Sequence, residues 1–162
     1  MTERYAVVAG RIRRELADLE SVVARAERAT AAARQRPQDQ DLYFDSAALN
    51  LHDFYAGLER VFQHIAATLD RSVPTGHEWH RELLRQMNVA LPQIRPQVLS
   101  TEAVRQIDEY LRFRHVVRKV YTFEFSPPQV ERLVQDLRPA FDRVKTELLA
   151  FADFLDELVQ GQ

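Results

Sequence analysis

Apolar residues recur every three or four positions along almost the whole chain, and this periodicity constrains the fold more than any other feature. Strict alternation of apolar and polar residues, the pattern of a half-buried strand, is almost absent. The periodicity therefore predicts an all-α protein. The chain has 162 residues, 46% of them hydrophobic, which suffices to bury one substantial core. We expect a single domain over residues 1–162.

Prolines and polar connections divide this pattern into four long helices and one short helix. We expect them at residues 3–36, 41–70, 77–89, about 100–125 and from 127 onward. The spacing of Thr75 and Glu78 matches a capping box that starts the short helix. Ser126 is the expected N-cap of the last helix, with proline in its first turn. Long helices joined by short connections predict an antiparallel four-helix bundle with one additional short helix.

Composition excludes several classes of protein. The chain has no cysteine, so disulfides, cysteine zinc sites and cysteine nucleophiles are excluded. Its first residues are charged where a signal peptide is apolar, and no apolar run approaches the roughly 20 residues that span a bilayer. We therefore expect a cytoplasmic protein with no membrane partner. The 22 basic and 24 acidic residues give a net charge of −2, so any affinity for nucleic acid must come from a local patch.

The fourth expected helix carries such a patch. Its apolar seam continues into two arginines and a tyrosine, in the order Val104, Ile107, Leu111, Arg114, Arg118 and Tyr121. At about 100° per residue, Arg118 lies ~40° to one side of Arg114 around the helix axis, and Tyr121 lies ~20° to the other side of Arg114. The segment from Arg105 to Tyr121 has five basic and two acidic residues, so the rest of the chain carries −5.

Two interpretations of these arginines remain open at this point. A guanidinium group does not enter an apolar seam without a partner. The partner is either a carboxylate of the same bundle, such as Asp53 or Glu59 of the second helix, or a phosphate from outside the chain. Periodicity alone does not decide between a structural ion pair and a phosphate site.

The segment from Phe113 to Tyr121 resembles the signature of the HepT-like toxins, which belong to the HEPN superfamily of small helical ribonucleases. That signature reads arginine, four residues, histidine, one residue, tyrosine, and Arg114 and Tyr121 match its ends without a gap. The resemblance touches most of the chain from about residue 47 onward. It implies a HEPN-like bundle that acts on RNA as the toxin of a toxin–antitoxin system. Further similarity lies in Leu51-His-Asp-Phe-Tyr55 with Glu59, in Trp79-His80 with Leu83-Leu84, and in Tyr121-Thr-Phe-Glu-Phe125.

The resemblance also implies roles for individual residues. Arg114 is expected to hold the phosphate, and Arg112 and Arg118 to bind RNA. The family histidine falls at Lys119, so either Lys119 or the neighbouring His115 supplies the base on the ribose 2′-hydroxyl. Such a site is a metal-independent endoribonuclease that needs no cofactor. The alternative is a catalytically silent module of the same fold that docks a nucleotidyltransferase.

Partners follow from the same resemblance. The family forms its RNA cleft between two subunits, so we expect a homodimer. The expected antitoxin is a nucleotidyltransferase that adds AMP to Tyr121 and places negative charge in a cationic cleft. Asp53 and Glu59 are candidate partners that orient Arg114 or Arg118. His77 and His80 have helical spacing but no evident third ligand, so we expect no metal site.

Overall fold

The computed structural model describes residues 2–119 and 125–161, with Arg118 and Lys119 described in their backbone only. It is 84% helical, which confirms the all-α prediction. No helix in the described part of the chain is long and apolar enough to cross a bilayer. The α-helices are α1 (Thr2–Gln35), α2 (Gln40–Ile65), α3 (Trp79–Met87), α4 (Thr101–Lys119) and α5 (Pro127–Gln160), with one 3-10 turn, η1 (Pro37–Asp39), and one π-helical turn, η2 (Ala66–Asp70).

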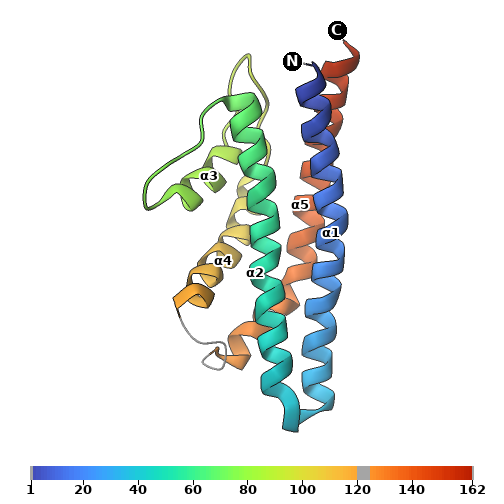
Figure 1. The fold of residues 1–162 in the computed structure, drawn as a ribbon, viewed down its shortest axis with the longest axis vertical. Coiled ribbons are helices and arrows are strands. Elements are labelled where there is room, and N and C mark those ends of the chain that lie inside the picture. Colours follow the sequence, from blue (N-terminus) through green and yellow to red (C-terminus); the bar gives the residue numbers. More distant parts are fainter. Residues whose placement is uncertain (1, 120–124, 162) are drawn as a thin grey trace.

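The four long helices run alternately in opposite directions, and the two termini lie at the same end of the bundle (Figure 1). Helix α1 packs against α2 and α5, and α4 packs against α2 and α5. The short α3 contacts α2 and α4. This arrangement confirms the antiparallel bundle with one additional short helix. It also places α3 against the two helices that carry the candidate site.

The predicted seams form the core. The apolar residues spaced three or four apart along α2 and η2 are buried, namely Leu51, Tyr55, Leu58, Phe62, Ile65 and Leu69. Phe54 makes edge-on contacts with Tyr110 of α4 at 5.3 Å and Phe141 of α5 at 6.1 Å between ring centroids. The Tyr110 hydroxyl donates a hydrogen bond to the Leu133 carbonyl at 2.7 Å. These contacts fix α4 in place, because buried aromatic pairs combine large apolar area with a preferred geometry.

Two expected helix ends are wrong. The capping box does not form, because the N-cap of α3 is Glu78 and Thr75 lies before it, separated by Gly76 in a left-handed conformation (φ 99°). The fourth helix was expected to reach about residue 125, but Phe125 lies in a bend and not in a helix. Ser126 is extended (ψ 114°), as expected for a residue that precedes a proline. Ser126 is the N-cap of α5, as predicted, although its side chain makes no capping hydrogen bond.

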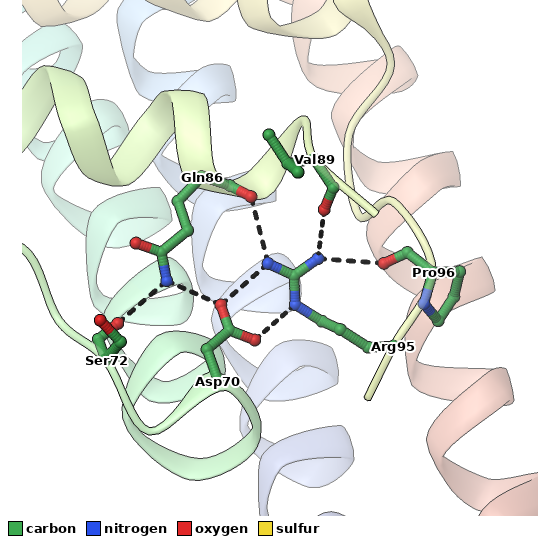
Figure 2. Close-up of polar contacts among 6 residues, drawn as sticks. All are labelled: Asp70, Ser72, Gln86, Val89, Arg95 and Pro96. Carbon is green, nitrogen blue, oxygen red and sulfur yellow. Dashed lines mark hydrogen bonds and ion pairs between the residues drawn. The ribbon is translucent and has the colours of Figure 1, made fainter. Parts of the chain in front are cut away.

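A buried ion pair anchors the C-terminal end of α3. Figure 2 shows the Asp70 carboxylate facing the Arg95 guanidinium, at 2.6 Å from Nε and 2.8 Å from Nη2. Arg95 also donates to the carbonyls of Gln86, Val89 and Pro96 at 3.1, 2.8 and 3.0 Å. The side chains of Arg95 and Asp70 are 0% and 2% exposed. We call Asp70, Gln86 and Arg95 the α3 clamp, because they join η2, α3 and the segment that follows α3.

Candidate active site

Arg114 lies on α4 where the apolar seam predicts a core residue, and its side chain is half-buried. Its Nε and Nη1 atoms are buried, yet no residue in the described ranges offers either of them a hydrogen bond. No ion pair within 4 Å joins it to a carboxylate of the described residues either. A buried polar group without a partner costs roughly 1–3 kcal/mol. The fold therefore leaves two buried donors of Arg114 without a hydrogen bond among the described residues.

Tyr55 of α2 lies within electrostatic reach of Arg114. Its hydroxyl is also buried, and the Glu59 carboxylate lies close enough to act on it. Burial is the main cause that raises the pKa of Tyr55, followed by the negative charge of Glu59 one turn along α2. The positive charge of Arg114 acts in the opposite direction on the same pKa. Tyr55 thus remains a neutral phenol that is acted on by the buried Glu59 carboxylate and the half-buried Arg114 guanidinium.

Glu59 is paired with a histidine instead of an arginine. Its Oε2 atom lies 2.7 Å from Nδ1 of His80, and the two residues are 6% and 7% exposed. The Trp79 ring covers the imidazole of His80, with centroids 3.6 Å apart and planes tilted by 31°. In the described part of the chain, no hydrogen bond or ion pair joins Glu59 to Arg114. The predicted role of Glu59 as a partner of Arg114 therefore stays a prediction. Glu59 instead fixes His80, a residue on a different helix.

His115 joins this group from α4. It is half-buried and directly follows Arg114 in sequence. The rings of His80 and His115 lie 5.9 Å apart between centroids and meet nearly at right angles, at 82°. We call Tyr55, Glu59, His80, Arg114 and His115 the α4 site. It places a guanidinium, which donates hydrogen bonds to anions, next to the His115 imidazole, a group able to act as an acid or base on a phosphodiester.

The remaining predicted residues are placed differently. Arg112 is exposed and forms an ion pair with Asp108 one turn earlier at 2.7 Å. Asp53 is exposed beside His52, with Nδ1 and Oδ1 3.5 Å apart, and does not contact Arg114. The side chains of Arg118 and Lys119, and all of Tyr121, lie outside the described residues, so their predicted roles stay predictions.

His80 is a site residue to which sequence analysis assigned no role, although it belongs to the Trp79-His80 similarity and to the histidine pair named above. Glu59 and His80 are 21 residues apart on different helices. No periodic pattern connects them. The second member of that pair, His77, is exposed. Within residues 2–119 and 125–161, no three histidine, aspartate or glutamate side chains gather as a metal-ligand group.

Comparison with known proteins adds one finding. The chain from residue 46 to residue 155 matches the family model described as HepT-like protein. No curated protein and no solved structure matches the chain. The matched range contains α3, α4 and every residue of the α4 site. Because the match covers more than half of the 162 residues, the chain belongs to the HepT-like protein family.

Proposed function

We propose that this protein is the toxin of a toxin–antitoxin pair and that the α4 site binds and cleaves RNA without a metal ion. The observation that carries this proposal is the half-buried Arg114, whose Nε and Nη1 have no acceptor among the described residues. A phosphate offers several acceptor oxygens, and a guanidinium that turns toward it presents its donors as a planar fork that matches phosphate geometry. The HepT-like family membership agrees with an RNA target.

The residues of the site support a specific reaction. His115 takes the proton of the ribose 2′-hydroxyl, and the 2′-oxygen attacks the adjacent phosphorus. The bond from phosphorus to the 5′-oxygen breaks, and that oxygen takes a proton from Lys119, which occupies the family's histidine position. The products are a 2′,3′-cyclic phosphate and a 5′-hydroxyl. Arg114 stabilises the charge that develops on the phosphate oxygens.

The direct test is cleavage of RNA in EDTA by the wild-type protein and single variants. We expect Arg114→Ala and His115→Ala to lose activity by about 100-fold or more, as for removal of one transition-state donor or one acid–base group. Lys119→Ala tests the acid role in the same assay. Arg105→Ala is the matched control, because Arg105 is an exposed arginine of the same helix, paired with Glu102. Equal cleavage by Arg114→Ala and the wild-type protein would show that the α4 site does not cleave the RNA.

RNA binding without cleavage by the wild-type protein would favour the alternative, an interaction module that docks a nucleotidyltransferase. Growth separates the two hypotheses in cells. The nuclease predicts arrested growth on expression that Arg114→Ala relieves. The silent module predicts that expression of either protein leaves growth unchanged.

The partners are part of the proposal. The antitoxin is a nucleotidyltransferase that joins AMP from ATP to the Tyr121 hydroxyl and releases pyrophosphate, which adds negative charge beside the arginines. Mass spectrometry after incubation with that enzyme and ATP tests this step, and an unmodified Tyr121 contradicts it. Two subunits form the RNA cleft, so light scattering is expected to report a dimer at micromolar concentration.

A further inference from the structure

The pair of Glu59 and His80 has no role in the reaction as written above. Both side chains are more than nine-tenths buried, at 8% and 9% exposed. Replacing such a buried pair with apolar side chains of similar volume is often neutral or stabilising. In a bundle whose neighbouring core positions are aromatic and aliphatic, stability alone therefore does not explain this pair.

The contacts of His80 restrain its ring from several sides. Glu59 accepts the Nδ1 proton of His80 at 2.7 Å, which fixes the tautomer and leaves Nε2 for any other proton exchange. Trp79 covers the ring at 3.6 Å. The α3 clamp holds the other end of the same short helix. The ring that faces His115 is thus fixed by polar, aromatic and backbone contacts together.

We propose that Glu59 and His80 are positioning residues for His115. Their paired side chains hold the His115 ring in its near-perpendicular orientation beside Arg114 and select the nitrogen that takes the 2′-hydroxyl proton. The 5.9 Å between the two ring centroids, at 82°, is the juxtaposition that carries this inference. It rests on the proposed function, because His115 is the base of that reaction.

The main test is the double variant Glu59→Leu/His80→Phe, which keeps apolar volume and a ring while it removes the hydrogen bond and both ionisable groups. We expect it to fold and to bind RNA with the wild-type Kd. We expect kcat to fall by about 100-fold, the cost of a small misplacement of a reacting group. A wild-type kcat in the folded double variant overturns the inference.

Glu59→Gln is the second variant, in case the double variant does not fold. It keeps an acceptor for His80 and removes only the charge, so a smaller loss of kcat at unchanged Kd is expected. Wild-type kcat in a folded Glu59→Gln protein counts against the inference. His64→Gln is the matched control, since His64 contacts Arg11 of α1 through hydrogen bonds and is not part of the α4 site, and the kcat of this variant is expected to be unchanged.

Nitrogen NMR of the His115 ring gives a measurement that needs no RNA. We expect one dominant tautomer in the wild-type protein and a mixture of tautomers in the double variant. The same ring-nitrogen shifts in both proteins overturn the inference even if RNA is cleaved. If the tautomers differ between the two proteins but the wild-type protein neither binds nor cuts RNA, the positioning role is supported and the proposed function fails.

Discussion

Two arginines enter the interior of this bundle, and their surroundings are opposite. Arg95 uses all five of its N–H donors, on two oxygens of Asp70 and three backbone carbonyls. Arg114 keeps Nε and Nη1 buried with no acceptor in the described part of the chain. Arg95 lies between η2, α3 and the segment after α3 and bonds to all three, whereas Arg114 lies on the seam of α4. One guanidinium therefore has its hydrogen bonds satisfied within the fold, and the other has donors that the described residues leave unsatisfied.

The comparison teaches that burial alone does not identify a functional arginine. A buried charge that is fully bonded is a structural contact, and removing its partner leaves an uncompensated charge. A buried charge without acceptors costs free energy in the unbound protein and regains it when a ligand supplies them. The two cases make opposite predictions for stability and for binding.

The largest expected effect is on the clamp. Arg95→Met leaves the Asp70 carboxylate buried and unpaired, so we expect the free energy of unfolding to fall by about 3–5 kcal/mol in urea denaturation. Arg105→Met, at an exposed ion pair, is expected to change it by less than about 1 kcal/mol. A loss below about 1 kcal/mol for Arg95→Met would remove the contrast between the two buried arginines.

Arg114→Leu tests the opposite case. We expect the free energy of unfolding to stay equal or to rise, because an unbonded guanidinium is replaced by a seam residue. RNA affinity is expected to fall by about 10- to 100-fold, the loss of charged hydrogen bonds worth roughly 1.5–3 kcal/mol. Urea denaturation and fluorescence anisotropy measure the two quantities. Destabilisation as large as that of Arg95→Met would show that Arg114 is structural.

The salt dependence of RNA binding tests whether Arg114 contacts a phosphate. The slope of log Kobs against log salt for single-stranded RNA is expected to become shallower by about 0.7 in Arg114→Leu, as for the loss of one phosphate contact. An unchanged slope with weaker binding would indicate that Arg114 acts on the fold of the site instead.

The smallest effect is expected at an exposed arginine contact, where Arg11 Nη1 lies 2.6 Å from Nε2 of His64. Burial, and then the charge of Arg11, lower the pKa of His64. Because the pKa of His64 is lower in the folded than in the unfolded state, its contribution to stability is present above the unfolded-state pKa. That contribution is lost as the pH falls through the folded-state pKa. Between pH 7.5 and 5.5 we expect the wild-type Tm to fall slightly more than that of His64→Gln, by about 1 °C or less. A larger fall in the variant would contradict this sign.

Much of the fold could be predicted because helical periodicity is a local property of the sequence. Most residues at helical spacing on α1, α2 and α5 are buried, and the Ser100 hydroxyl caps α4 by accepting a hydrogen bond from the Ala103 amide at 3.1 Å. The α3 start was missed because the left-handed turn at Gly76 separates Thr75 from the helix.

The candidate site was predictable only in part. Arg114 and His115 stand out because a charged residue interrupts an apolar seam beside an imidazole. Glu59 was expected near an arginine and instead binds His80, since α3 brings an imidazole to the carboxylate. Asp53 was also a candidate, and it lies exposed beside His52.

The sequence by itself determined the all-α class, the helix seams and the position of Arg114 on one of them, because each depends on residues within a few turns of one another. Only the tertiary structure decided which buried arginine is bonded and which histidine the buried glutamate holds. Those outcomes depend on residues 21 to 25 positions apart, whose distances are set by how helices pack and not by any local pattern.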